Sequence, residues 1–371
     1  MRGPRAAIGL LLALVVGSAA LPAAEDARAA SGQPVAVVAY YDSLALPRLV
    51  DALDAEGPSA DVPVLFGNYW GSPRPPKGVK PPFIPAPTKV AGPRYAYTPI
   101  MPIVRGTLWE RRRVSPSEAA RLAAAGQGRL AGRVPQLGRL LRGGPVTRRR
   151  WAEELGRRFR DRVRAERRAG RRVVGWQFDE IPSEVVGGRR GGALQSFTAG
   201  ILRGLHRGRS TRGDQPERGV VYAATKSLAL AGRGRARPFW NAVNRTASVF
   251  VGEEYPAIVG SASGAARRLA SGQRRMAASG GAQRALARRY VVGLTPGYRL
   301  VAGLGGNVKR RSRAAVNAWR LAYVRARARS PGVVGFAQFN FRGQNANEQV
   351  MRDVARALAE GMKLIAARGQ R

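Results

Sequence analysis

Short apolar runs alternate with longer amphipathic segments along most of the chain, and this alternation predicts strands and helices in turn. The apolar runs are rich in Val, Tyr, Phe and Ala, and each is followed by a turn signal. They predict strands at Val35–Tyr41, Val62–Gly67, Tyr95–Ile100, Val173–Phe178, Gly219–Ala224, Ser248–Gly252, Tyr290–Leu294 and Val333–Phe339.

The segments between these runs carry Arg, Ala and Leu with helical spacing. In one of them an apolar residue recurs every four positions, at Trp151, Leu155, Phe159 and Val163. Such a stripe on an otherwise basic helix is typical of a helix that covers a sheet. Helices are predicted at Leu46–Ala55, Pro116–Ala125, Arg148–Ala169, Ala193–His206, Phe239–Asn244, Gly264–Ala278, Arg310–Ala328 and Asn347–Ala367.

Strands that alternate with helices indicate βαβ units and a parallel sheet. Eight such units in a chain of 371 residues favour a closed (β/α)8 barrel, one domain over residues 31–371. The strands are apolar along nearly their whole length, which suits burial on both faces. An open, doubly wound α/β sheet is the alternative architecture. Residues 67–93 contain eight prolines and predict a long loop.

The first 30 residues have the pattern of a secretory signal peptide. Arg2 and Arg5 precede the apolar run Ile8–Val16, and small residues follow as far as Ala30. This run is shorter than the ~20 residues that a membrane span needs. We therefore expect an exported, secreted or extracytoplasmic chain that has no transmembrane anchor after signal cleavage.

The charge of the chain is strongly positive, with 64 Lys+Arg against 23 Asp+Glu and a formal net charge of +41. The basic residues are scattered through the predicted helices, and no motif interleaves them with aromatic residues. We expect no specific nucleic-acid partner, but attraction to anionic surroundings such as acidic envelope polymers.

The supply of metal-binding and nucleophilic residues is small. There is no cysteine and only one histidine, His206, so thiolate catalysis, Cys-based metal sites and multi-histidine zinc sites are excluded. No metal and no cofactor are expected.

Two pairs of adjacent acids stand at the ends of predicted strands, where a barrel forms its site. Asp179 and Glu180 end the fourth strand in WQFDE, and Glu253 and Glu254 end the sixth in VGEEYP. Because side chains alternate along a strand, one member of each pair is expected to face the barrel axis. Hydrolysis of a glycosidic bond needs one protonated and one ionised carboxyl group. The alternative is that these acids cap helices or pair with arginines.

With these motifs the chain resembles secreted (β/α)8 glycoside hydrolases that carry one catalytic acid after the fourth strand and another after the sixth. The resemblance implies catalysis by Asp179 or Glu180 together with Glu253 or Glu254. Gln177 departs from it, because a chitinase-like signature has an acid there, which argues against substrate-assisted cleavage of acetylated sugars. The side chains expected to bind the carbohydrate, at the ends of these and the other strands, are Asp42, Trp70, Tyr255, Tyr298, Asn340 and Arg342.

Two other functions remain open. A non-catalytic envelope protein would use the same fold and its positive charge to hold an anionic or carbohydrate polymer. A lyase or aldolase would use Lys226, just beyond the fifth strand, to form a Schiff base.

Overall fold

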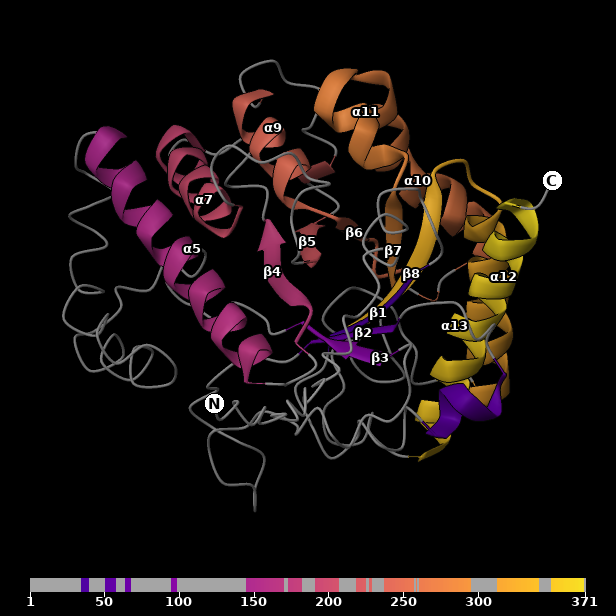
Figure 1. Cartoon of the computed structure of the whole chain (residues 1–371). Helices are drawn as coiled ribbons and strands as arrows, with labels where there is room; N and C mark the ends of the chain where they lie inside the picture. The colour runs from indigo at the N-terminus through magenta and orange to yellow at the C-terminus, as the bar shows by residue number, and fades with distance from the viewer. Residues whose placement is uncertain are drawn as a thin grey trace, which may run out of the picture.

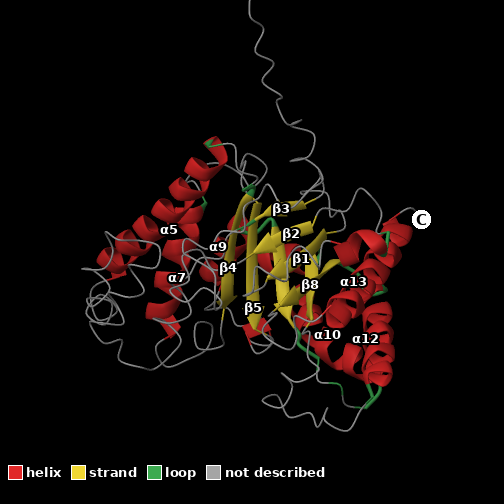
Figure 2. Cartoon of the chain, turned by 90° about the horizontal axis from the view of Figure 1, so that it is seen from below, coloured by secondary structure: helices red, strands yellow, loops and turns green. Residues whose placement is uncertain are grey.

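The chain folds as an α/β protein around a parallel sheet, seen in the computed structural model (Figures 1 and 2). The residues that the structure describes are 35–39, 51–57, 64–67, 95–98, 145–169, 173–181, 191–206, 218–224, 227–228, 237–256, 258, 260–294, 312–339 and 348–369. The predicted signal peptide and the predicted helix Pro116–Ala125 lie outside these residues.

The sheet has eight strands, and every neighbouring pair in it is parallel. The strands are β1 (Val35–Ala39), β2 (Val64–Gly67), β3 (Tyr95–Tyr97), β4 (Gly175–Ile181), β5 (Arg218–Ala224), β6 (Val249–Glu253), β7 (Tyr290–Leu294) and β8 (Val333–Phe339). Their order is β3-β2-β1-β8-β7-β6-β5-β4, so the first strand lies beside the last. The predicted parallel sheet is thus confirmed, and the predicted bounds of β7 and β8 agree with the structure.

β4 differs most from its prediction, because it continues three residues beyond Phe178 to Ile181. Its pairing with β5 shifts register between Phe178 and Ile181, and Ile181 then pairs with Ala223. The irregularity lets the strand continue through the acidic pair Asp179-Glu180, where the sequence indicated its end.

Seven labelled helices surround the sheet. They are α5 (Pro145–Arg168), α7 (Gly191–Leu205), α9 (Arg237–Thr246), α10 (Ala262–Ala278), α11 (Gly281–Ala287), α12 (Arg313–Ala328) and α13 (Glu348–Gly369). All but α11 were predicted to within a few residues. α11 follows α10 across Gly280 and Gly281, whose positive φ values of 76° and 48° end one helix and start the next. No helix in the part of the chain that the structure describes is both long and apolar enough to cross a bilayer.

The two faces of the sheet bury different sets of side chains. One face packs under the helices and forms the larger core, which includes Trp176, Phe178, Phe250 and Phe336. The other face forms a smaller cluster whose described members come from strands or from residues next to them. They are Val35, Leu65, Val220, Tyr222, Val249, Val251, Val291, Val334 and Ala337, with Ala96, Val174 and Tyr255 packed against them. We call this second face of the sheet the inner face, and the side chains that cluster on it the inner cluster.

The two ends of the sheet, β3 and β4, approach one another through side chains. The amide nitrogen of Gln177 in β4 donates a hydrogen bond to the hydroxyl of Thr98, the residue after β3, at 2.8 Å. Thr98 is held in turn by the carbonyl oxygen of Phe66, which accepts from both its backbone N–H and its hydroxyl. No backbone ladder between β3 and β4 is present among the described residues.

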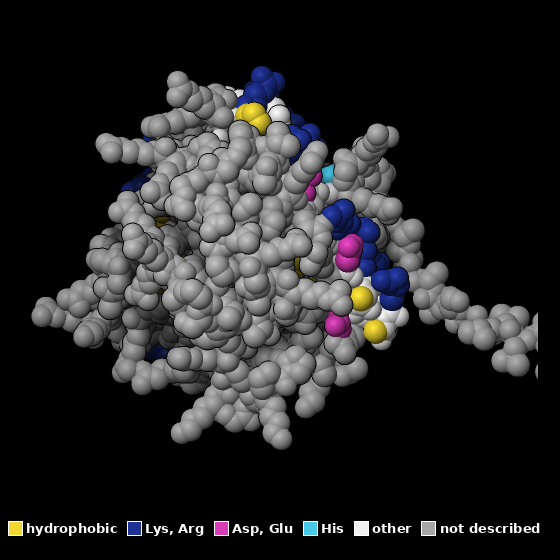
Figure 3. All heavy atoms as spheres, turned by 90° about the vertical axis from the view of Figure 1, so that its left-hand side faces the viewer, with side chains coloured by type: hydrophobic (Ala, Val, Ile, Leu, Met, Phe, Trp, Pro, Cys, Tyr) yellow, Lys and Arg dark blue, Asp and Glu magenta, His cyan; other side chains and the backbone are white. Residues whose placement is uncertain are grey.

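α5 and α7 pack with their backbones in direct contact through glycines. A Cβ atom on Gly156 would lie 2.1 Å from the carbonyl oxygen of Ile201, and one on Gly204 would lie 2.1 Å from that of Glu153. Phe159 and Val163 of the predicted apolar stripe are buried in this region, as expected. Arg203 of α7 pairs with Glu153 of α5 across the two helices at 2.8 Å. On the face drawn in Figure 3, basic and acidic side chains lie beside one another in the described part.

Candidate functional site

The carboxyl ends of β4, β5 and β6 lie level with one another at one edge of the sheet. Ile181 pairs with Ala223, which in turn pairs with Gly252, so Asp179 and Glu180 lie just before this level on β4, and Glu253 lies just after it on β6. Strands in a sheet are spaced by about 4.8 Å, which puts the backbones of β4 and β6 about 10 Å apart. The acid pairs are therefore brought to one edge, with β5 between them.

Glu253 lies on the inner face of the sheet. Val249 and Val251 of the same strand belong to the inner cluster, and alternation places Glu253 on their side. Its side chain is buried, and the hydroxyl of Tyr255 donates a hydrogen bond to its Oε1 at 3.0 Å. Tyr255 adopts a positive φ of 36°, rare for an L side chain, and itself packs on the inner cluster. The turn after β6 thus bends so that Tyr255 comes back over Glu253.

A polar layer lies beneath this acid, in the interior of the sheet. The hydroxyl of Tyr222 donates to the amide oxygen of Gln177 at 3.0 Å, and the amide nitrogen of Gln177 donates to Thr98. Gln177 is fully buried. Its amide joins β5 to the end of β3, so this position, where the resemblance leads one to expect an acid, here supports the sheet.

Glu254 points the other way, toward the helices. Arg327 of α12 forms two hydrogen bonds with its carboxylate, Nη2 to Oε1 at 2.6 Å and Nε to Oε2 at 3.0 Å, and Tyr323 also donates to Oε2. The side chains of Glu254 and Arg327 have no solvent exposure. The expected division of the pair between inside and outside is thus present, with Glu253 inside and Glu254 held by an arginine.

The ion pair continues into a buried network. Arg327 Nη2 also donates to Gln273 of α10, and Nη1 donates to the hydroxyl of Ser330, both at 2.8 Å. The guanidinium carbon lies 5.8 Å from the ring centroid of Tyr290. The hydrogen bonds from Arg327 and Tyr323 hold the Glu254 carboxylate in place. They connect β6 to α12 directly and to α10 through the bond from Arg327 to Gln273.

Burial and the ion pair set the pKa values in this network. Burial raises the pKa of Tyr290 and of Tyr323 well above 10.0, and the Glu254 carboxylate adds to both shifts. Burial alone would lower the pKa of Arg327, but the Glu254 carboxylate more than offsets this effect and the pKa lies above its usual value. At neutral pH the tyrosines are therefore neutral and the arginine is charged.

The other predicted site residues have side chains that lie outside the described part of the chain. The backbone of Asp179 and Glu180 belongs to β4, but their side chains are not among those described. The residues that lie outside the described part altogether are Asp42, Trp70, Lys226, Tyr298, Asn340 and Arg342. In the described ranges, no group of three or more His, Asp or Glu side chains is placed to hold a metal ion.

The partners of the acids were not predicted from the sequence. Tyr323 and Arg327 are four residues apart, as are Val316 and Arg320, and all four are buried on one face of α12. The sequence signal that could have found this partner is an arginine spaced with the buried positions of a helix, because a buried charge requires a partner.

No family model matches the chain, and no curated protein matches it.

Proposed function

We propose that the chain is a (β/α)8 barrel whose site lies at the carboxyl ends of its strands. The strand order supports this, because it is the circular order of a barrel opened between β3 and β4, whereas a doubly wound sheet reverses its order at a switch point. The inner cluster supports it too, since it draws a side chain from, or next to, each of the eight strands. The hydrogen bond from Gln177 to Thr98 spans the remaining gap.

Within this barrel we propose a glycoside hydrolase that acts on an extracytoplasmic carbohydrate. The observation that carries the proposal is the buried carboxylate of Glu253, facing inward at the same edge where β4 delivers Asp179 and Glu180. The two strands are about 10 Å apart across β5, and Glu253 lies about two residues, or about 7 Å, farther along the strand direction than Asp179 and Glu180. Side chains that lean toward one another from this distance suit the 5–9.5 Å that separates the two carboxyl groups of glycosidases.

Each acid has a role in this mechanism. Glu253, whose carboxylate accepts a hydrogen bond from Tyr255 and is held in place by it, is the nucleophile or the base that activates water. Asp179 or Glu180 is the acid that protonates the leaving oxygen. Glu254 takes no part, because Arg327 and Tyr323 already occupy its oxygens on the other side of the sheet.

The test is hydrolysis of a panel of polysaccharides, measured as released reducing ends. Glu253→Gln should lower kcat roughly 10²–10⁴-fold, because it removes a carboxylate that acts in the transition state. Asp179→Asn and Glu180→Gln, made separately, identify the second acid by the same loss. Glu348→Gln, the same chemical change on an exposed helix residue, is the matched control and should keep full activity. Full activity of Glu253→Gln would rule out the mechanism.

A non-catalytic envelope protein is the second candidate, and the formal net charge of +41 favours it, because such a charge attracts anionic polymers. Such a protein would bind an anionic or carbohydrate polymer without cleaving it. Polymer binding that weakens steeply with salt, with no reducing ends released, would favour this function over hydrolysis.

A further inference from the structure

An arginine-lined cavity lies at the opposite end of the sheet from the proposed carbohydrate site. It measures about 520 Å³ and is bounded by α10, α11, the end of α12 and the turn before β8. Its described lining residues are Ala270, Gln273, Arg274, Ala277, Arg284, Ala287, Arg288, Arg327, Ser330, Pro331 and Gly332. Gly332 directly precedes β8, and its carbonyl oxygen accepts from the N–H of Tyr290 at the start of β7. The cavity is therefore at the amino ends of these strands, and its volume is within the range of small-molecule sites.

Two buried polar side chains that line this cavity, Gln273 and Arg327, already have hydrogen-bond partners within the protein. The amide nitrogen of Gln273 donates to the carbonyl oxygens of Ala287 and Pro331, each at 2.9 Å. Its amide oxygen accepts from Arg327, which also donates to Ser330. The charge of Arg327 is neutralised by Glu254 behind it. Gln273 and Arg327 are buried and bonded to one another, so they shape the cavity and leave recognition to the residues at its rim.

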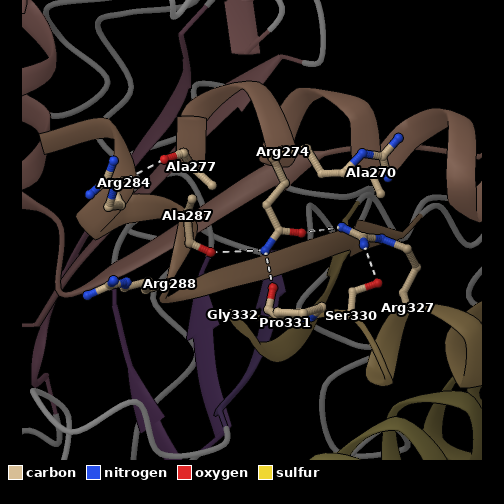
Figure 4. Close-up of a pocket in the computed structure, with 11 residues that line it drawn as sticks. Ala270, Arg274, Ala277, Arg284, Ala287, Arg288, Arg327, Ser330, Pro331 and Gly332 are labelled. Carbon is tan, nitrogen blue, oxygen red and sulfur yellow. Dashed lines mark hydrogen bonds between the residues drawn. The ribbon is translucent and has the colours of Figure 1, made fainter. Parts of the chain in front are cut away.

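The rim carries a positive charge that nothing in the described part of the chain neutralises. Arg274, Arg284 and Arg288 are exposed, and no acidic residue is among the described lining residues. Arg274 and Arg284 each donate to a backbone carbonyl oxygen, of Arg267 and Ala277 respectively, which fixes part of each guanidinium without cancelling its charge. No ion pair of any of these three arginines occurs among the described residues. Figure 4 places Arg284 and Arg288 on one side of the cavity and Arg327 on the other.

These features specify the chemistry of a ligand. Several guanidinium groups around one cavity repel a cation and bind a group with several negative oxygens, because each guanidinium offers paired donors that match phosphate. The walls between them are apolar, with Ala270, Ala277 and Pro331, and accept a small organic body attached to that group. The chain-wide positive charge would attract any anion, and at this place three exposed arginines also line a cavity.

We infer that this cavity binds a phosphate group, either free or esterified. The site is distinct from the carbohydrate site and does not depend on the proposed hydrolysis. Phosphate carried by a small molecule and phosphate linked within a polymer or lipid present the same oxygens to Arg274, Arg284 and Arg288. They differ in the number of ester links, which an experiment can separate.

The test is calorimetric titration of the full chain with methyl phosphate, a monoester, and dimethyl phosphate, a diester, at 0.15 M salt (about physiological ionic strength). The variant with Arg274, Arg284 and Arg288 all changed to Gln should bind at least about tenfold more weakly. Its matched control changes three exposed arginines outside the cavity, Arg268, Arg275 and Arg356, to Gln and removes the same charge. The control should keep the affinity of the parent chain.

A second variant keeps the charge and fills the space. Ala277→Trp places a large ring at an exposed position of the cavity wall and should abolish binding while the net charge is unchanged. The site is supported if either ester binds more weakly to Ala277→Trp and to the cavity triple, the variant with Arg274, Arg284 and Arg288 changed to Gln. Binding of the monoester alone identifies a free or terminal phosphate, and binding of the diester identifies a phosphate linked on both sides. Equal affinity in the cavity triple and the control triple, or undiminished binding by Ala277→Trp, would overturn the inference.

Discussion

Glu254 and Arg327 neutralise one another at a place where neither side chain reaches solvent. Taking either charge from water is costly, and the cost is recovered only because each partner has further hydrogen bonds, from Tyr323 to the carboxylate and from the guanidinium to Gln273 and Ser330. The pair connects a strand end to two helices. Its contribution therefore depends on both partners being present together.

Removing one partner of this pair should unfold the chain more readily. Glu254→Gln leaves Arg327 charged and buried, and we expect a loss of about 3–5 kcal/mol in the free energy of unfolding, measured by chemical denaturation. Arg327→Met should cost a similar amount, since it leaves Glu254 without its cation. The double variant removes both charges and should lose several kcal/mol less than the sum of the single losses. Additive losses would show that the two residues are not coupled.

At the level of single residues, part of the site follows from the sequence alone. Strand alternation correctly separates Glu253 from Glu254, because it is a local property of extended backbone. The hydrogen bond from Tyr255 to Glu253 is not predictable in the same way, since it depends on a positive φ that a tyrosine seldom adopts. The pairing of Glu254 with Arg327 joins residues 73 positions apart, and only packing brings them together.

At the level of elements, α5 and α7 are joined more closely than side chains would allow. Gly156 on one helix and Gly204 on the other let each backbone touch its neighbour, and Arg160 donates to the carbonyl oxygen of Gly204 at 3.0 Å. The pair of helices thus forms one layer over the β4 side of the sheet (Figure 1). The close contact requires hydrogen in place of a methyl group at these positions.

Gly204→Ala should therefore destabilise the chain although alanine is the better helix former. The gain in helix propensity is about 1 kcal/mol, but the new Cβ atom would lie 2.1 Å from the carbonyl oxygen of Glu153, a backbone atom that cannot turn aside. We expect a net loss of about 1–3 kcal/mol in thermal or chemical unfolding. Gly369→Ala, at the end of α13 with nothing within 4 Å, is the control and should be neutral or stabilising. An unchanged Gly204→Ala chain would show that the helices can separate at no cost.

The elements are the level at which the sequence is most informative. The bounds of β7, β8 and most of the helices were predicted closely, because the apolar residues that recur with a regular period in the sequence are those that the fold buries. The exceptions have local causes. α11 is too short to show a period and depends on Gly280 and Gly281, and β4 runs on through a register shift that a count of alternating residues cannot reveal.

At the level of the whole molecule, eight parallel strands are held in one sheet with β1 between β2 and β8. The parallel α/β class was predictable from alternation, and the contacts between strands were not. The hydrogen bond from Gln177 to Thr98 and the inner cluster join residues from strands distant in the sequence. Sequence periodicity carries no information on which strand lies beside which.

The stability of the whole chain should fall in alkaline solution. Tyr290 and Tyr323 have folded pKa values well above 10.0, so above pH 10 they ionise in the unfolded chain but stay protonated in the native one. Their stabilising effect is complete below about pH 10 and is lost as the pH rises toward the folded pKa values, by up to about 1.4 kcal/mol per pH unit for each tyrosine.

Chemical denaturation between pH 8 and 11 (bracketing the ordinary tyrosine pKa of about 10) measures this decline. Tyr290→Phe removes one of the two groups and should make the decline shallower. Two results would contradict the raised pKa values of these tyrosines. One is a free energy of unfolding that stays constant over this range, and the other is a Tyr290→Phe chain whose free energy falls with pH as steeply as that of the parent chain.

The pairing of Val35 with Gly335 has a consequence for synthesis. The ribosome makes β1 before the other strands of the sheet and β8 after them, so one edge of β1 stays without its neighbour until the other seven strands have been made. During that interval the exposed edge is open to pairing with other nascent chains. A polypeptide cut short before β8 therefore keeps a first strand with one unpaired edge.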